Sequence, residues 1–303
     1  MKKIYVYGTG SKAFRLLPAL SLKHHIIGFI DSNITLQGQD LLGIKIYHLS
    51  EFSSGVSNQI IIASSFIDEI KQTLAAEGIT NSIAVEDLPE VMLLAKKLNE
   101  IECRYRQQST AFIPQVPLKD KHLKNATLIT NRQKLLELLP PNGIVAELGV
   151  ANGDYTSQIL KISQPKKLHL IDIWQSERYN EILFNNVRTK FAAELTIDKV
   201  EIHRKLSHEA AKDFSQQYFD WIYIDTSHCY NGTKKELEYY ASKIRDGGFI
   251  AGHDYTMGNW NNQYRYGVME AVHEFCVKYN WRFKYLTMDL SEGQSFAIER
   301  IPQ

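Results

Sequence analysis

The chain has 303 residues, of which 44% are apolar and 23% are charged, and its formal net charge is +1 at pH 7. This composition is typical of a globular protein and excludes a disordered or fibrous chain, while the small net charge argues against a nucleic-acid coat or a membrane-surface binder. The length suits two domains, and small solutes are the expected partners.

The three cysteines are scattered, odd in number and without C-x-x-C spacing (Cys103, Cys229 and Cys276). We therefore expect neither a disulfide framework nor a cysteine zinc site, and we predict a reducing, cytoplasmic location. The apolar run after the N-terminal lysines ends at Gly8, which is too early for a signal peptide. No segment approaches the roughly 20 apolar residues needed to span a bilayer, so membrane insertion is not expected.

The first segment predicts a strand at 4–7, a helix at 11–22 and a second strand at 26–30. These elements form a βαβ unit. A strand at 59–63, a helix at 67–77 and an edge strand at 82–85 follow, which predicts a first domain over residues 1–88.

A glycine-rich turn joins the first strand to the first helix. Residues 8–13 read G-x-G-x-x-A, and Asp31 lies about 20 residues further on, as in dinucleotide-binding fingerprints. We predict a nucleotide site formed by Gly8, Gly10, Ser11 and Asp31. These residues are compatible with three alternatives for the site: a nucleotide sugar, NAD or no ligand.

Residues 89–124 predict a helical linker, because apolar residues recur at helical spacing over 89–110 and are followed by Pro114 and Pro117. The second domain is expected over residues 125–303. In it, strands and helices alternate with a rhythm that predicts a parallel sheet wrapped by helices. The expected strands are 144–148, 168–171, 200–203, 221–224 and 249–251, and the expected helices are 131–139, 155–162, 177–194, 208–214, 233–244 and 267–279. Two further strands, 282–286 and 295–298, predict a terminal hairpin with an antiparallel strand. The fold class is therefore α/β, with two Rossmann-like doubly wound domains.

A second glycine loop follows the strand at 144–148. Glu147 closes the strand, Gly149 and Gly153 lie in the loop, and Asp172 closes the next strand. This pattern is typical of nucleoside binding, because small residues let the backbone approach the ligand and the second acid accepts hydrogen bonds from ribose hydroxyls.

Four polar residues follow two other strands of the same sheet. Asp225 ends one strand and is followed by His228, while His253 and Asp254 follow another strand. Because parallel sheets bind ligands at the carboxyl ends of their strands, we expect these four side chains to converge.

The runs AELGVANGDYTSQIL, LHLIDIW and FDWIYIDTSHCYNGTKKELEYYASKIRDGGFIAGHDY resemble class I S-adenosylmethionine (SAM)-dependent methyltransferases over residues 126–300. They are most similar to the small-molecule branch that contains macrolide-sugar O-methyltransferases and cephalosporin-hydroxylase-like proteins. The resemblance implies that Glu147, Gly149 and Gly153 lie beside the methionine part of SAM, that Asp172 binds the ribose, and that Ser207 touches the adenine.

The same resemblance implies a magnesium ion at Asp225 and at the positions of His253 and Asp254, with His228 as general base. A base and a metal suit methyl transfer to a sugar hydroxyl, which is a weak nucleophile. His253 departs from the pattern, since metal-binding members usually carry an acid there. Three options follow: magnesium held by Asp225 and Asp254 with waters, a nitrogen-tolerant metal such as manganese, or no metal with His253 as a second base.

The segment 255–266 is rich in residues that hold sugars, and it is interpreted either as a substrate lid or as an ordinary surface loop. Its aromatic and polar members are Tyr255, Trp260, Asn261, Asn262, Tyr264, Arg265 and Tyr266. Trp174 either stacks near the adenine or packs at the sheet edge.

The runs GFIDSN, GIKIYHLSEF and QIIIASS resemble the Rossmann-like N-terminal domain of bacterial polysaccharide-biosynthesis proteins, some of which bind nucleotide sugars there. Together the resemblances imply a SAM-dependent O-methyltransferase that acts on a sugar hydroxyl of a nucleotide sugar or surface-polysaccharide precursor. The alternatives are an NAD-dependent oxidoreductase that uses the N-terminal fingerprint, and a non-catalytic scaffold that binds SAM or a nucleotide sugar. A homo-oligomer is compatible with the sequence.

Overall fold

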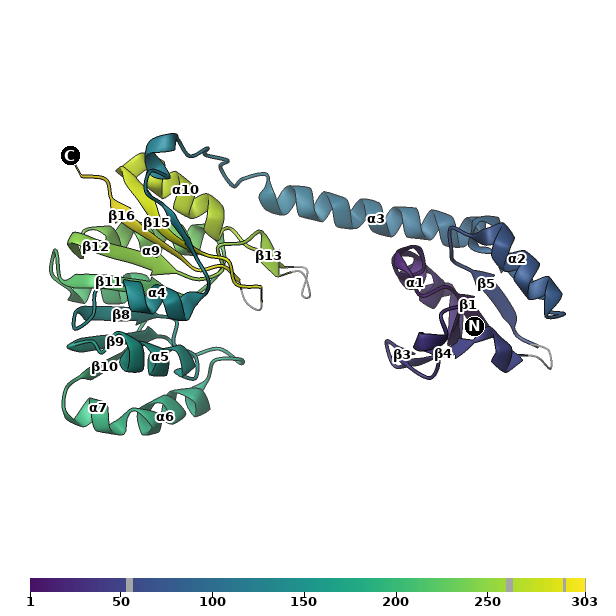
Figure 1. Ribbon diagram of the computed structural model, residues 1–303, viewed down its shortest axis with the longest axis horizontal. Helices are drawn as coiled ribbons and strands as arrows, with labels where there is room; N and C mark the ends of the chain where they lie inside the picture. The colour runs from purple at the N-terminus through teal and green to yellow at the C-terminus, as the bar shows by residue number, and fades with distance from the viewer. Residues whose placement is uncertain (53–56, 260–263, 291–292, 303) are drawn as a thin grey trace. The chain divides into compact units, whose positions relative to one another are not determined.

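The computed structural model describes residues 1–52, 57–259, 264–290 and 293–302. The chain divides into two compact units, Met1–Ser109 (unit 1) and Thr110–Gln303 (unit 2) (Figure 1). The division falls inside the segment predicted as a linker, residues 89–124. The domain bounds 1–88 and 125–303 stay predictions.

Unit 1 contains a six-stranded sheet in the order β3-β4-β2-β1-β5-β6. Its strands are β1 (Lys2–Tyr7), β2 (His24–Asp31), β3 (Asp40–Leu41), β4 (Ile44–His48), β5 (Gln59–Ile62) and β6 (Ser82–Ala84). All neighbouring strands pair in parallel except β3, which runs antiparallel to β4 at the edge. Strand β1 pairs with β2 on one side and with β5 on the other, so the strand order changes direction beside β1. The Gly8–Gly10 turn follows β1 and therefore lies at this topological switch point.

Helices cover both faces of this sheet. Leu20 of α1 (Ser11–Lys23) and Val91 of α3 (Pro89–Thr110) belong to one buried cluster, whereas Ile70 and Leu74 of α2 (Ile67–Ala76) belong to the other. The start of α3 is therefore part of the core of unit 1. Three short 3-10 helices, η1 (Ile34–Leu36), η2 (Leu49–Phe52) and η3 (Val85–Asp87), connect the remaining elements.

Unit 2 contains an eight-stranded sheet in the order β10-β9-β8-β11-β12-β16-β15-β7. Its strands are β7 (Thr127–Ile129), β8 (Ile144–Leu148), β9 (Lys167–Asp172), β10 (Val200–Arg204), β11 (Phe219–Ile224), β12 (Ile244–Gly252), β15 (Trp281–Thr287) and β16 (Phe296–Arg300). Among them only β16 runs against its neighbours, which confirms the predicted antiparallel hairpin at the end of the domain. The sequence did not predict β7, which pairs in parallel with β15.

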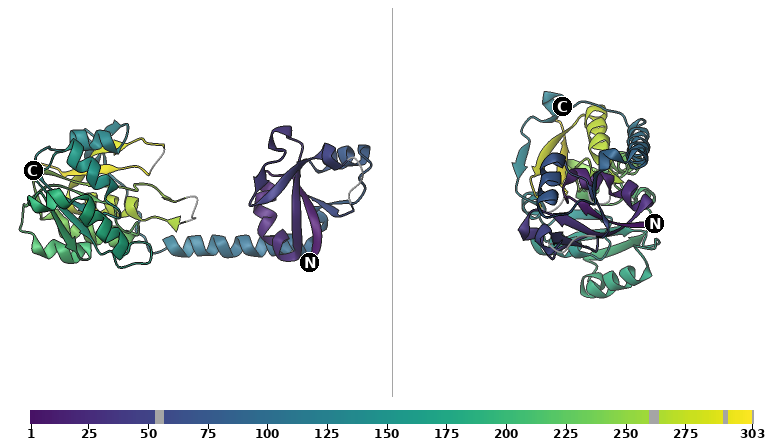
Figure 2. Two further views of the ribbon diagram at one scale, coloured as in Figure 1. Left: turned by 90° about the horizontal axis from the view of Figure 1, so that it is seen from below. Right: turned by 90° about the vertical axis from the view of Figure 1, so that its right-hand side faces the viewer.

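The helices of unit 2 lie on both faces of the sheet (Figures 1 and 2). One buried cluster joins the sheet to α4 (Arg132–Leu138), α5 (Asp154–Ile162) and α6 (Glu181–Lys190). The other joins it to α8 (Ser207–Ala210), α9 (Tyr230–Ala241) and α10 (Val268–Tyr279). The doubly wound α/β fold predicted from the alternation is thus confirmed.

Smaller elements complete unit 2: η4 (Asp120–His122), η5 (Ala211–Asp213) and a two-stranded ribbon of β13 (Gly258–Asn259) and β14 (Tyr264–Arg265). The helix predicted at 177–194 is in fact two helices, α6 and α7 (Ala192–Thr196). They meet at Phe191, whose buried ring packs against Gly153. In the described part of the chain, no helix is long and apolar enough to cross a membrane.

Candidate functional site

The glycine loop after β8 touches the end of β11 directly. Gly149 has a φ of +85°, and a Cβ added to it would lie only 1.9 Å from the carbonyl oxygen of Asp225. Real Cβ atoms do not approach backbone that closely, so glycine is required here by the neighbouring strand. The predicted cofactor loop and the predicted catalytic edge are therefore one packed unit.

Asp172, at the end of β9, holds this loop in place. Its Oδ2 accepts hydrogen bonds from the backbone N–H groups of Val150 (2.8 Å) and Ala151 (3.0 Å), and its Oδ1 accepts one from Trp174 (3.2 Å). A carboxylate offers about four acceptor positions, so Asp172 can accept one further hydrogen bond, and its predicted contact with ribose stays a prediction. The side chain of Trp174 is 1% exposed and donates to Ala151 O at 2.8 Å, so it packs in the core and fixes the loop.

Glu147 lies on β8 beneath the loop and is only 1% exposed. Burial raises the pKa of this carboxyl to about 8, and the charges of Asp225 and Asp172 add to the rise although a hydrogen bond from Thr156 opposes it. Thr156 Oγ1 donates to Glu147 Oε2 at 2.5 Å. The carboxyl thus anchors the start of α5 to the sheet.

Ser207 begins α8, and its hydroxyl donates to Glu236 Oε1 on α9 at 2.5 Å. Thr226 Oγ1 contacts the same carboxyl at 2.7 and 2.8 Å. Glu236 is buried, and desolvation raises its pKa to about 7. The adenine contact predicted for Ser207 stays a prediction. Glu236 was not found from the sequence, because helical spacing indicates a buried position but not which side chains it contacts.

The four residues predicted to converge do so at the carboxyl edge of β11 and β12. His228 Nδ1 lies 2.8 Å from Asp254 Oδ2. His253 Nδ1 lies 3.3 Å from Asp254 Oδ1 and 3.8 Å from Asp225 Oδ2. We call Asp225, His228, His253 and Asp254 the edge cluster.

The charges of the edge cluster are strongly coupled. Desolvation raises the pKa of Asp225, although the charge of His253 opposes this rise. Burial also disfavours ionisation of Asp254, but hydrogen bonds from His228 and His253 outweigh it and hold the pKa of Asp254 well below its usual range. For His253, burial lowers the pKa, yet the hydrogen bond to Asp254 and the two acidic charges raise it overall. The carboxylate of Asp254 therefore stays ionised and accepts a hydrogen bond from each of the two imidazoles.

The backbone at Asp254 is strained, with a φ of +55°. Gly293 packs against it, since a Cβ on Gly293 would lie 2.4 Å from Asp254 Oδ1. The loop before β16 thus holds the Asp254 carboxylate in place beside His228. Non-glycine residues in this conformation are uncommon and concentrate at functional sites.

Among the described residues of the aromatic segment after Asp254, Tyr266 lies against the edge cluster. The ring of Tyr266 packs against that of His228 at a tilted angle, with ring centroids 4.5 Å apart. Tyr255 instead points inward, where its hydroxyl meets His273 Nε2 at 2.5 Å and its ring packs on Phe283. Tyr264 is exposed and Arg265 binds Glu270. The predicted lid residues Trp260, Asn261 and Asn262 lie outside the described residues.

The edge cluster also offers a set of donors for a metal ion. One atom each from Asp225, His253 and Asp254 lie within 4.8 Å of one another. Two carboxylates and one imidazole fit a divalent cation that tolerates nitrogen, such as Mn²⁺, better than Mg²⁺, which prefers oxygen ligands.

In unit 1 Asp31 holds Thr9, which lies between the predicted nucleotide residues Gly8 and Gly10. Its Oδ2 accepts from the backbone N–H (3.2 Å) and the hydroxyl (2.6 Å) of Thr9, and its Oδ1 accepts from Asn33 N–H (2.9 Å). Gly8 has a φ of +111°, and Gly10 has open space where a side chain would be. Ser11 begins α1 and is exposed.

The family model described as "Methyltransferase domain" matches residues 146–255, a range that runs from β8 through the glycine loop to the edge cluster. Unit 2 carries the domain of a SAM-dependent methyltransferase. A second model, described as "C2185-like, N-terminal", matches residues 1–84. No curated protein matches the chain.

Solved methyltransferases share features of this architecture at low similarity. A Clostridium thermocellum protein described as an rRNA methylase is 16% identical, with a TM-score of 0.45 over 58% of this chain and 98% of its own. A Streptococcus mutans protein described as a methyltransferase, in complex with SAH, is 16% identical, with a TM-score of 0.41 over 56% and 96%. The B. subtilis tRNA methyltransferase TrmK is 11% identical, with a TM-score of 0.41 over 57% and 67%. Such similarity leaves the acceptor of this methyltransferase open.

Proposed function

We propose that the methyltransferase domain transfers the methyl group of SAM to a hydroxyl oxygen, and that the acceptor is a sugar, either in a nucleotide sugar or in a surface-polysaccharide precursor. The observation that carries this proposal is the 2.8 Å contact between His228 Nδ1 and Asp254 Oδ2. An imidazole attached to a carboxylate is a suitable base for a hydroxyl, whereas an amine or thiolate acceptor needs less help.

The proton transfer follows from this contact. Because Asp254 is ionised, the Nδ1–H group of His228 donates a hydrogen bond to its carboxylate, and Nε2 of His228 is left as the acceptor. As the acceptor oxygen forms its bond to the methyl carbon, the carbon–sulfur bond breaks and its electron pair goes to sulfur. The hydroxyl proton ends on His228 Nε2, and the sulfonium becomes a neutral thioether.

A divalent metal ion would be held by Asp225, His253 and Asp254. When bound, it would lower the pKa of the acceptor hydroxyl and orient that hydroxyl. His228, which contacts Asp254, would still remove the proton. Glu147, Gly149, Gly153, Asp172 and Ser207 are proposed to surround SAM, with Asp172 at the ribose.

Methyl transfer from labelled SAM to a panel of UDP-, GDP- and dTDP-sugars tests this proposal directly. We expect label in at least one nucleotide sugar, attached through an ether that survives mild base. If the protein binds SAM but labels only RNA, the sugar acceptor is wrong. If calorimetry detects no SAM binding at all, the assignment of the cofactor residues fails as well.

For unit 1 we propose a nucleotide or nucleotide-sugar site at Gly8, Gly10, Ser11 and Asp31. The turn lies at the switch point of the sheet, and Asp31 orders it through Thr9. We expect Asp31→Ala to weaken binding of a UDP-sugar or NAD while SAM affinity stays unchanged. Unchanged affinity for all of these nucleotides would instead assign Asp31 to holding the turn. A cytoplasmic location, where nucleotide sugars are available, is part of this proposal.

A further inference from the structure

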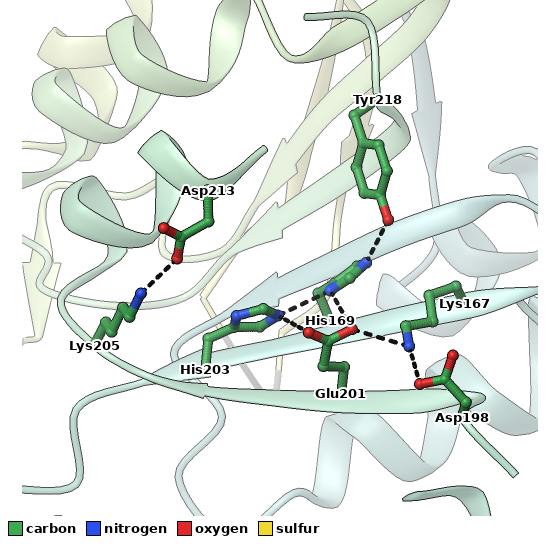
Figure 3. A network of polar contacts seen from close by, with 8 residues as sticks. All are labelled: Lys167, His169, Asp198, Glu201, His203, Lys205, Asp213 and Tyr218. Atoms are coloured by element: carbon green, nitrogen blue, oxygen red, sulfur yellow. Dashed lines mark hydrogen bonds and ion pairs between the residues drawn. The ribbon is translucent and has the colours of Figure 1, made fainter. Parts of the chain in front are cut away.

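A second cluster of ionisable side chains lies between β9 and β10. In the parallel register of these strands Glu201 is opposite His169. Because side chains alternate along a strand, His203 points to the same side as Glu201, and Lys167 to the same side as His169. The K-x-H of one strand therefore meets the E-x-H of the next (Figure 3).

Three potential ligand atoms converge in this cluster. His169 Nδ1 lies 2.9 Å from His203 Nε2. Glu201 Oε1 lies 3.6 Å from His203 Nε2, and its Oε2 lies 3.7 Å from His169 Nδ1. Two nitrogens this close cannot both carry protons, so at least one lone pair points into the space between the rings.

The surroundings of the two imidazoles resemble the outer shell of a metal site. Tyr218 OH lies 3.1 Å from His169 Nε2, so the Nε2–H group can donate a hydrogen bond to the tyrosine oxygen. The lone pair of Nδ1 is then available to bind a metal ion. Phe214 and Phe219 pack edge-on against His169. The side chains of His169 and His203 are 3% and 12% exposed, but that of Glu201 is 46% exposed, which leaves a path for an ion.

We propose that His169, His203 and Glu201 bind a zinc ion or a similar transition-metal ion. Two imidazoles and one carboxylate are a common zinc ligand set, completed by water, and zinc–nitrogen bonds are about 2.1 Å. The two nitrogens need to separate by only a few tenths of an ångström to accept the ion. The site lies on β9 and β10, whereas Asp225 follows β11 on the other side of β8. It is therefore separate from the edge cluster, and its ion would join the edge strand β10 to the rest of the sheet.

The ammonium group of Lys167 competes with a metal ion for Glu201, and this competition can be tested. Its Nζ lies 2.9 Å from Glu201 Oε2 and 2.5 Å from Asp198 Oδ1, so it neutralises one oxygen of the carboxylate that we assign to the metal. Removing the ammonium frees Glu201 for the ion and removes a nearby positive charge. A site for a metal ion thus predicts that Lys167→Met binds the ion more tightly, by about tenfold. A cluster that only stabilises the fold predicts no metal binding for either protein.

The experiment is a titration of the full-length protein with Co²⁺, followed by its visible absorption, and with Zn²⁺ in competition. We expect His203→Gln to weaken binding at this site at least tenfold and Tyr218→Phe to weaken it by about 10- to 100-fold. His253→Gln reports on the edge cluster, and His208→Gln is a matched control for loss of an imidazole on nearby α8. Both variants are expected to keep the absorption band that His203→Gln loses.

Circular dichroism of each variant separates loss of ligand from loss of fold, and Lys167→Met and Tyr218→Phe keep the proposal testable if His203→Gln does not fold. The proposal is overturned if Co²⁺ and Zn²⁺ bind with the same affinity to wild type, His203→Gln and Lys167→Met. It is also overturned if the wild type binds neither ion at millimolar concentration.

Discussion

The Nδ1 atom of His228 lies 2.8 Å from Oδ2 of Asp254, a residue whose backbone is held at a φ of +55°. The strain orients the carboxylate, and the carboxylate fixes which imidazole nitrogen remains free to accept a proton. We expect His228→Ala to lower kcat for methyl transfer by about 10²- to 10⁴-fold with little change in SAM affinity. Steady-state kinetics and calorimetry measure the two effects. His208→Ala is the matched control, and a His228→Ala enzyme with normal kcat would remove this residue from the mechanism.

The mixed donor set at Asp225, His253 and Asp254 makes a prediction about metal preference. We expect EDTA to reduce activity and Mn²⁺ to restore it better than Mg²⁺, because one ligand is nitrogen. His253→Asp converts the set to oxygen only and should reverse this order. The measurement is the methyltransferase activity of the EDTA-treated wild type and His253→Asp proteins as the concentration of each ion is raised. Full activity after chelation would show that proton removal by His228 proceeds without a metal.

The contact between Gly149 and the Asp225 carbonyl predicts an unusually large effect of one methyl group. We expect Gly149→Ala to lower the free energy of unfolding by about 2–4 kcal/mol and to weaken SAM binding, since it combines a left-handed φ with overlap of backbone atoms. Gly247→Ala is the control, because Gly247 has a φ of +77° but no heavy atom within 4 Å of the added Cβ. That change should cost about 1 kcal/mol. Equal losses for the two variants in urea denaturation would contradict the steric argument.

Glu236 predicts how stability changes with pH. Its pKa rises from an ordinary 4.5 to about 7 in the folded protein, so the folded state binds its proton more tightly than the unfolded chain. The contribution of Glu236 to the free energy of unfolding should therefore fall as pH rises from about 4.5 to about 7, by roughly 3 kcal/mol at most. Glu236→Gln should make this part of the profile less steep, as measured by urea denaturation at several pH values, while buried Glu147 keeps its own contribution. Glu238→Gln, on the same helix, serves as control and should leave the slope unchanged.

Much of unit 2 was predictable because each strand has a short apolar run and ends in a polar residue that topology brings to one edge. The convergence of Asp225, His253 and Asp254 follows from this rule. The contact between Gly149 and Asp225 does not, because it depends on how closely two loops pack. Glu236 was missed because helical periodicity shows that a position is buried but not which side chain it meets.

The cluster of His169, Glu201 and His203 shows a different limit. The K-x-H pattern at 167–169 and the E-x-H pattern at 201–203 are visible in the sequence. Each is also typical of an ordinary strand with one polar face. They become a set of ligands only when the register of β9 against β10 is known, and a shift by one residue would turn one pattern to the other face of the sheet.

The place of β16 in the sheet has a consequence for synthesis on the ribosome. This strand lies between β12 and β15, and β7 is attached to the sheet through β15. Until Phe296–Arg300 has left the exit tunnel, β7 and β15 have no place in the sheet, although β7 is made about 170 residues earlier. Unit 1 is compact within residues 1–109 and can fold while unit 2 is still being translated. Nascent-chain proteolysis should therefore find unit 1 protected early and unit 2 protected only after Phe296–Arg300 has emerged from the exit tunnel.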